Sequence, residues 1–166
     1  MKKLLLIPIL VLVVSLVLPI SAAALTSQII DLVAGQNMVV GTVEVSNNST
    51  HLRVIYNVAP PLQILETHLA VAESIDDVPK NNKGNPKIGK FPYKDSGDYS
   101  IPLGDWTPGT NLVIAAHAVV YNPCEDWEET AWGMGEYCNM QKYTRWSIPF
   151  TENGGSWAEY FEYRVQ

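Results

Sequence analysis

The chain has 166 residues and carries 11 basic and 17 acidic side chains, which gives a formal net charge of −6. Proteins that bind nucleic acid need a basic surface, so this excess of acid excludes that class. The length fits one ordinary domain, and an acidic surface suits cations or solubility outside the cell.

The first 24 residues have the pattern of a secretory signal peptide. Two lysines precede an apolar run from Leu4 to Ile20, and the small residues Ala22-Ala23-Ala24 follow it, as a signal peptidase requires. A transmembrane helix is the alternative, because the run approaches the roughly 20 apolar residues that span a bilayer. Two prolines in the run favour cleavage. We therefore predict that residues 1–24 are removed and that residues 25–166 form one secreted domain, extracellular or at the cell surface, with no membrane span.

Apolar and polar residues alternate along most of the mature chain, which is the pattern of half-buried β-strands. Turn-forming pairs rich in Asn, Gly and Pro occupy most gaps between the alternating segments. With no long helical pattern, the predicted fold class is all-β, an antiparallel β-sandwich of about seven to nine strands. One helical turn is expected after the N-cap Ser74. Strands are expected at Met38–Val45, Leu52–Val58, Gln63–Val71, Tyr99–Leu103, Tyr143–Phe150 and Trp157–Val165.

The mature N-terminus contains a further strand candidate, Ile29–Val33, ahead of a flexible joint at Ala34–Asn37. This segment either pairs within its own sheet or adds as an edge strand to a neighbouring copy. The second arrangement would build a filament. Both alternatives remain open at this point.

The stretch from Asn111 to Cys138 divides into two halves. The first, Leu112–Tyr121, is apolar except for His117 and predicts a central strand buried on both faces. The second half is acidic and is closed by the two cysteines. A secreted chain with two cysteines most simply forms one disulfide, so we predict that a Cys124–Cys138 bond staples a protruding loop. Closing a loop of about 15 residues stabilises by about 3 kcal/mol in the chain-entropy model.

Two segments of the chain carry opposite charge. The basic segment has no acid and contains Lys80, Lys83, Lys87, Lys90 and Lys94. The acidic loop between the cysteines has no base and contains Glu125, Asp126, Glu128, Glu129 and Glu136. The two could meet within one molecule or between copies head to tail, and head-to-tail contacts generate rings or open filaments. The alternative is that each is a separately solvated loop.

The five carboxylates of the acidic loop are also a candidate calcium or partner site. Calcium takes about six to eight oxygen ligands, which carboxylates and carbonyls supply. The segment lacks the D-x-D-x-D-G order of an EF-hand, so the pattern is not specific. Calcium is therefore a candidate cofactor, and a solvated acidic loop is the alternative.

A second candidate site combines two histidines with carboxylates. Strand alternation places Glu66 and His68 on one face, and His117 lies in the middle of the apolar strand. If these two strands are neighbours, the three side chains converge, and Glu129 approaches from the acidic loop. Two histidines and a carboxylate bind Zn²⁺, Cu²⁺ or Fe²⁺. The alternative is a structural role, in which neutral histidines are hydrogen-bonded inside the sandwich.

Catalytic motifs are absent from the sequence. There is no G-x-S-x-G nucleophile elbow and no glycine-rich phosphate loop. Glu66 and Glu129 offer a carboxylate pair of the kind that glycosidases use, but any acidic protein offers such pairs. We therefore expect no enzyme, and a small metal-dependent hydrolase is the least favoured function.

Two features point to glycans. Trp127 and Trp132 are the tryptophans expected to be exposed, and exposed indole rings stack on sugars. Asn47 and Asn48 begin overlapping N-glycosylation sequons in a predicted turn. The tryptophans make a glycan-binding module the alternative function, whereas the sequons predict a modification.

Four segments resemble an all-β extracellular module that recurs in secreted proteins of archaea and bacteria: ETHLAVA, PKNNKGNPKIGKFPY, LVIAAHAVV and EETAWGMG. The resemblance runs from about Leu32 to Tyr163. It implies secretion and a β fold, and it carries over no catalytic or ligand residue. The cysteine pair is not attributed to it.

Together these observations favour a secreted structural or interaction module of the cell surface or extracellular matrix. Self-assembly through the N-terminal strand or through the oppositely charged loops is the expected mode of action. The expected partners are copies of the chain, other surface proteins or glycans.

Overall fold

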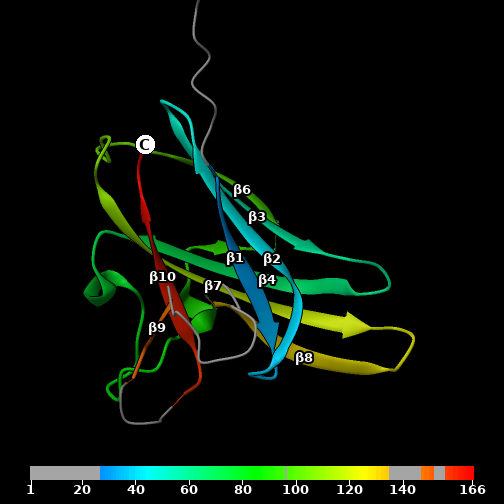
Figure 1. Cartoon of the computed structure of the whole chain (residues 1–166). Coiled ribbons are helices and arrows are strands. Elements are labelled where there is room, and N and C mark those ends of the chain that lie inside the picture. Colours follow the sequence, from blue (N-terminus) through cyan, green and yellow to red (C-terminus); the bar gives the residue numbers. More distant parts are fainter. Residues whose placement is uncertain (1–26, 96, 135–146, 152–155) are drawn as a thin grey trace, which may run out of the picture.

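The computed structural model describes residues 27–95, 97–134, 147–151 and 156–166, which form an all-β protein (Figure 1). The strands are β1 (Gln28–Ala34), β2 (Met38–Asn47), β3 (His51–Val58), β4 (Gln63–Ala72), β5 (Tyr93–Lys94), β6 (Asp98–Pro102), β7 (Asn111–Asn122), β8 (Trp127–Met134), β9 (Ser147–Pro149) and β10 (Glu159–Arg164). Two 3-10 turns, η1 (Ile75–Asp77) and η2 (Ile88–Lys90), are the helical elements of these residues, and no helix there could cross a membrane. The predicted signal peptide lies outside the described residues.

All paired strands run antiparallel and belong to one sheet in the order β5-β4-β7-β8-β1-β2-β3-β6, with β10 paired to β7 and β9 to β10. The end strands β5 and β6 follow one another in the chain, so the sheet curls until its edges nearly meet. At this junction the N–H of Asp95 donates to the Thr67 carbonyl on β4 (2.9 Å), and that of Tyr56 on β3 donates to the Gly97 carbonyl (2.7 Å). The predicted all-β antiparallel fold is confirmed. Its strands, however, form one barrel-like sheet whose halves face each other, instead of two separate sheets.

The inner face of the curled sheet holds the main core. Fully buried apolar side chains from seven of the described strands fill it, among them Leu32, Val43, Val54, Leu112 and Phe161. β7 is buried along nearly its whole length, because it lies between β4 and β8 and is also covered on its outer face. The prediction of a central strand buried on both faces is confirmed.

The connection between β4 and β5, residues 73–92, covers the outer face of the sheet. Its Val78 and Phe91 are buried in a second apolar cluster that includes Trp132 of β8. The helical turn predicted after Ser74 is η1. The predicted basic loop is more ordered than expected, because it contains η2 and β5.

The acidic segment expected to be a protruding loop is mostly a strand. β8 pairs with the C-terminal half of β7, from His117 opposite Trp132 to Asn122 opposite Trp127, so β7 and β8 form a hairpin with its tip at residues 123–126. The first half of β8 is exposed and acidic, and the second half is buried. The expectation of a loop is therefore wrong, since pairing with β7 and burial of the second half outweigh the charge of the first.

The N-terminal strand β1 lies inside the sheet. It pairs with β2 along its whole length and with β8 along Asp31–Ala34. Of the two arrangements expected for this strand, the chain adopts pairing within its own sheet. The predicted strand Tyr143–Phe150 is represented by β9, and its residues 143–146 lie outside the described residues.

Candidate functional site

Strand pairing brings two histidines together. His68 on β4 lies directly opposite His117 on β7, and their ring centroids are 5.5 Å apart. On the other side of His117, Trp132 of β8 lies directly opposite, with 4.9 Å between ring centroids. The three rings form a row across three neighbouring strands on the outer face of the sheet. The predicted convergence of the two histidines is thus observed, and Trp132 is a neighbour that the sequence pattern does not reveal.

His117 is buried without a hydrogen-bond partner. The residue is 3% exposed, and neither its Nδ1 nor its Nε2 meets a donor or acceptor in the described part of the chain. Nδ1 of the half-buried His68 is likewise without a partner there. Burial, and to a lesser extent the neighbouring His68, lowers the pKa of His117 to about 4. The His117 imidazole is therefore neutral at pH 7.

The carboxylates expected beside the histidines do not complete a metal-binding group with them. Glu66 is exposed, two positions before His68 on β4. Glu129 is exposed near the start of β8 and on the same side of that strand as the inward-facing Ala131, so the sheet separates it from His117. Among the described residues, no three His, Cys, Asp or Glu side chains gather closely enough to hold a metal ion. Of the four predicted residues, the structure brings together the two histidines.

Two carboxylates at the hairpin tip accept hydrogen bonds from their own hairpin. Glu125 accepts from the Asn122 amide (3.2 Å) and from the Trp127 indole N–H (2.8 Å). Asp126 accepts from the Tyr121 hydroxyl (3.0 Å). These bonds use one oxygen of each carboxylate. The next two acids, Glu128 and Glu129, are exposed on opposite sides of β8.

Three further residues of the acidic segment belong to the predicted disulfide or to the predicted calcium site: Cys124, Glu136 and Cys138. Cys124 is exposed at the hairpin tip. Glu136 and Cys138 lie outside the described residues. The disulfide and the calcium site therefore stay predictions.

The two tryptophans expected at the surface differ in burial. Trp132 is 3% exposed and packs against Phe91 and Phe150, with ring centroids 6.4 and 6.0 Å away. Trp127 is half-buried and packs against the inner core. The expected exposure of Trp132 is wrong, because the chain between β4 and β5 covers the outer face of β8. Of the two predicted glycan contacts, Trp127 retains an accessible ring.

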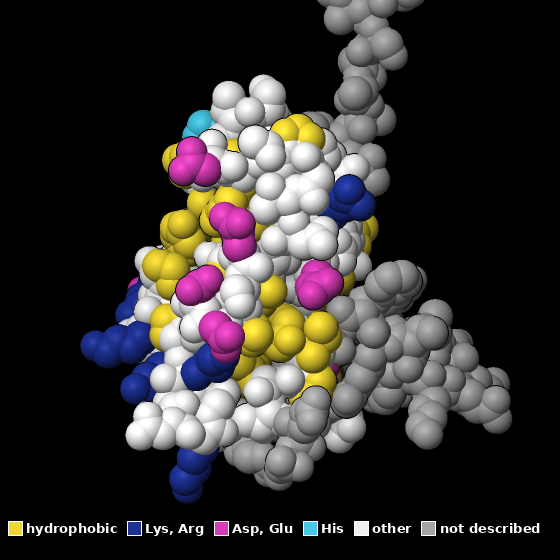
Figure 2. Space-filling model, turned by 90° about the vertical axis from the view of Figure 1, so that its left-hand side faces the viewer, with side chains coloured by type: hydrophobic (Ala, Val, Ile, Leu, Met, Phe, Trp, Pro, Cys, Tyr) yellow, Lys and Arg dark blue, Asp and Glu magenta, His cyan; other side chains and the backbone are white. Residues whose placement is uncertain are grey.

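The basic segment presents charge to solvent. Lys80 forms an ion pair with Asp76 (3.2 Å) and is half-buried. Figure 2 shows Lys and Arg side chains gathered mainly at the lower left of one face, with acidic side chains above them. The other four lysines of the segment are exposed: Lys83, Lys87, Lys90 and Lys94.

The overlapping sequons differ in accessibility. Asn47 is 6% exposed, and its side chain is hydrogen-bonded to Tyr163 and Gln166. Asn48 is exposed in the turn between β2 and β3, where its Oδ1 accepts from the N–H of Thr50 (2.8 Å). A glycan on Asn47 would break buried hydrogen bonds, so the burial of this side chain argues against glycosylation there, and both positions stay predictions. Asn48 is the favoured candidate.

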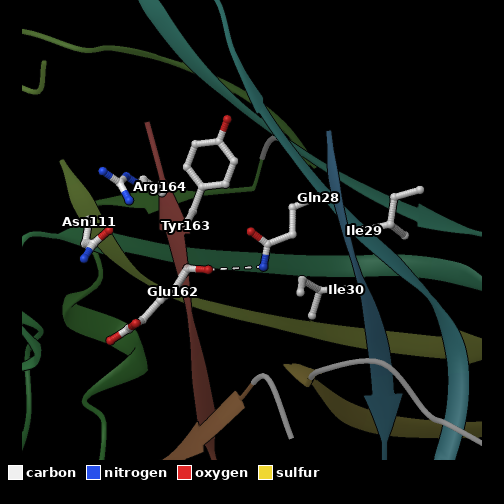
Figure 3. Close-up of a pocket in the computed structure, with 7 residues that line it drawn as sticks. All are labelled: Gln28, Ile29, Ile30, Asn111, Glu162, Tyr163 and Arg164. Atoms are coloured by element: carbon white, nitrogen blue, oxygen red, sulfur yellow. Dashed lines mark hydrogen bonds between the residues drawn. The ribbon is translucent and has the colours of Figure 1, made fainter. Parts of the chain in front are cut away.

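A groove of about 460 Å³ lies between β1 and β10 (Figure 3). On the sides that face the groove, β1 at Gln28–Ile30 and β10 at Glu162–Arg164 pair with no described strand, whereas on their other sides β1 pairs with β2 and β10 with β7. Side-chain amides bond to β10 carbonyls in place of a neighbouring strand. Gln28 donates to the Glu162 carbonyl (3.1 Å), and Gln166 donates to the Arg164 carbonyl (2.7 Å). The glutamines therefore protect the β10 edge from pairing with another strand.

Comparison of the chain with family models, with curated proteins and with solved structures finds no match. The resemblance to extracellular modules therefore stays a prediction from the sequence.

Proposed function

We propose that the chain is a secreted structural or interaction module of the cell surface or extracellular matrix that associates with copies of itself head to tail. The acidic β7–β8 hairpin of one copy contacts the basic segment, residues 80–94, of the next. The observation that supports this proposal is the location of opposite charges at opposite ends of the same pair of strands.

The β4–β7 ladder separates the two charged regions. Gln63 pairs with Tyr121 beside the hairpin, whereas Ala72, which leads toward the basic segment, pairs with Val113 at the far end of β7. The eight residue steps from Val113 to Tyr121 span roughly 27 Å of strand. In Figure 1 the hairpin tip projects to the right, and the green segment that follows β4 lies to the left. This separation is several times the ~8 Å screening length at physiological salt, so the hairpin and the start of the basic segment do not neutralise each other within one molecule. Lys94, at the end of the segment, lies closer to the hairpin, opposite His68 in the middle of β4.

Both regions keep exposed charge for a neighbour. The four described acids of the hairpin are exposed and form no ion pair with a described residue. Asp76 neutralises Lys80, which leaves four exposed lysines on the basic segment. A single exposed ion pair contributes about 0–1 kcal/mol, so a contact of this kind needs several pairs and weakens with salt.

Strand exchange is the less favoured route to assembly. β1 is already paired on both sides along Asp31–Ala34, and pairing with another copy would have to break those ladders. The neighbouring β10 edge is capped by Gln28 and Gln166. Contacts between charged side chains require no such rearrangement.

Sedimentation velocity of the purified mature protein tests the proposal. We expect larger species at about 20 mM NaCl that dissociate at about 500 mM NaCl, where exposed charges are screened. A protein that stays monomeric at both salt concentrations overturns the proposal, as does one whose association is independent of salt.

Paired charge reversals identify the contact. The variants Glu128→Lys/Glu129→Lys and Lys83→Glu/Lys87→Glu should each associate less than the wild type at low salt, since reversing two of the four exposed charges leaves that surface without net charge. An equal mixture of the two should associate again, because the unchanged hairpin of the second variant complements the unchanged basic segment of the first. The matched control Asp105→Lys/Glu162→Lys changes the net charge as much as the first variant at exposed positions elsewhere and should associate like the wild type. A mixture that stays monomeric contradicts the assignment of these two surfaces.

A further inference from the structure

The histidine pair contains most of the buried polar atoms that the fold leaves without a partner. Among the described residues these atoms are Nδ1 of His68, both ring nitrogens of His117 and one oxygen of Asn85. A buried polar group without a hydrogen bond is destabilising, so a cluster of such groups calls for a bound partner such as a water or an ion. We propose that His68 and His117 together bind one copper(I) ion.

The separation of the two rings fits a shared metal ion. A metal–imidazole bond of about 2.0–2.1 Å places the ion roughly 3.2 Å from the ring centre. Two imidazoles on one ion therefore have centroids roughly 5 to 6.3 Å apart for bond angles from tetrahedral to linear. The observed 5.5 Å between His68 and His117 lies inside this range and corresponds to a bent angle of roughly 120° at the ion. Turning either ring about its Cβ–Cγ bond leaves the separation almost unchanged, because the ring centre lies close to that axis.

The surroundings of the pair favour a monovalent ion. No carboxylate or thiol of the described residues joins the two histidines to complete a three-ligand site. Lys94, directly opposite His68 on β5, adds positive charge nearby. Burying a divalent ion without an anionic ligand is costly, and zinc also requires about four ligands. Copper(I) carries one charge, binds imidazole nitrogen and, as a d¹⁰ ion, is stable with two or three ligands, and the bent angle between the histidines leaves one side of the ion open to a third.

The neighbouring side chains supply a lone pair, an aromatic face and an entrance. Neither ring nitrogen of His117 is used in a hydrogen bond with a described residue, so a nitrogen lone pair is available to the ion. Trp132 lies 4.9 Å from His117 and offers an indole ring of the kind that attracts cations. His68 is half-buried and therefore connects the site to solvent.

Copper(I) titration of the mature protein tests the assignment. The protein is treated with iodoacetamide to block any unpaired thiol and titrated anaerobically with ascorbate against a chromophoric copper(I) chelator. At about 500 mM NaCl the proposed head-to-tail association is suppressed, so the two proposals fail independently. We expect one copper(I) per chain, at least tenfold weaker binding in His68→Ala, and no change in the matched control His51→Ala, which removes the third histidine of the chain. Absence of binding by the wild type, or equal binding by His68→Ala, overturns the proposal.

Nitrogen-15 spectra of the imidazole rings locate the ion without a substitution at the buried position. Copper(I) is diamagnetic, so one equivalent should shift the ring nitrogens of His68 and His117 and leave those of His51 in place. A shift confined to His51, or none at all, contradicts the site. Zinc in the same titration should bind at least tenfold more weakly, and equal or tighter zinc binding overturns the assignment to copper(I).

Discussion

The side-chain oxygen of Asn47 accepts a hydrogen bond of 2.6 Å from the hydroxyl of Tyr163, so one buried contact ties the end of β2 to β10. The same oxygen accepts from the backbone N–H of Gln166 (2.9 Å), and the Asn47 amide donates to the Gln166 carbonyl (3.3 Å). The C-terminal strand is thereby fixed to the sheet through Asn47 as well as through its ladder with β7.

Asn47→Ala should destabilise the protein. The substitution leaves the Tyr163 hydroxyl and the Gln166 backbone without these partners, which costs about 1–3 kcal/mol in the free energy of unfolding. Urea denaturation of wild type and variant measures the difference. The control Asn57→Ala changes an exposed asparagine on β3 and should stay within about 0.5 kcal/mol of the wild type. An equal decrease of the free energy of unfolding in the two variants would contradict the stabilising role of the Asn47 hydrogen bonds.

The two overlapping sequons provide a test of which asparagine is modified. Expressed in a host that glycosylates secreted proteins, the folded product should carry a glycan on Asn48. Ser49→Ala removes the sequon of Asn47 and should leave the glycan in place, whereas Thr50→Ala removes the sequon of Asn48 and should abolish it. Intact-mass measurement of the secreted protein distinguishes these outcomes. A glycan that survives Thr50→Ala would contradict the structural role of Asn47.

The buried His117 makes the stability depend on pH. Its pKa is lowered from 6.5 to about 4 in the folded protein, while an unfolded chain keeps the ordinary value. Between these pH values the unfolded chain binds a proton that the folded chain does not, so acid favours unfolding. The contribution is complete above about pH 6.5 and is lost progressively toward about pH 4, up to about 3 kcal/mol for a pKa difference of about 2.5.

His117→Phe should remove this dependence, because phenylalanine keeps an aromatic ring and has no proton to bind. Urea unfolding at several pH values from about 7 to about 4 is measured for both proteins, and the difference in unfolding free energy is plotted against pH. Carboxylates that titrate in the same range contribute to both proteins and cancel. A constant difference would mean that His117 is already solvated in the folded state.

Local patterns predict most strands because a half-buried strand shows its buried face at every second residue. β2 and β4 end within two residues of the expected ranges. β8 is not predicted from the sequence, because its first half is exposed and acidic and shows no strand pattern. Its structure depends on pairing with β7 and β1. Closure into one curled sheet likewise depends on pairings between distant residues, which periodicity does not specify.

For the candidate sites too, local features can be predicted from the sequence, whereas features that depend on distant parts of the chain cannot. The sequence predicts that His68 and His117 meet if their strands are neighbours. It does not predict that the strands are neighbours, because strand order depends on contacts between distant residues. The burial of Trp132 comes from Phe91 and Phe150, which belong to other parts of the chain. The burial of Asn47 comes from a partner 116 residues later, so its sequon gives no warning of a structural role.

The close approach of β2 to β3 at Gly41 gives a further test of the fold. A Cβ at this position would overlap the Asn57 carbonyl oxygen and lie 3.0 Å from a methyl carbon of Val58, so alanine forces two paired strands apart. Gly41→Ala should therefore lower the free energy of unfolding by about 1–3 kcal/mol or more. The matched control is Gly89→Ala in η2, where a Cβ meets nothing within 4 Å. There the loss of unfolded-state freedom should stabilise by about 0.4–1 kcal/mol. Thermal or urea unfolding should thus give opposite signs for the same chemical change, and a Gly41→Ala variant as stable as the wild type would contradict the β2–β3 register.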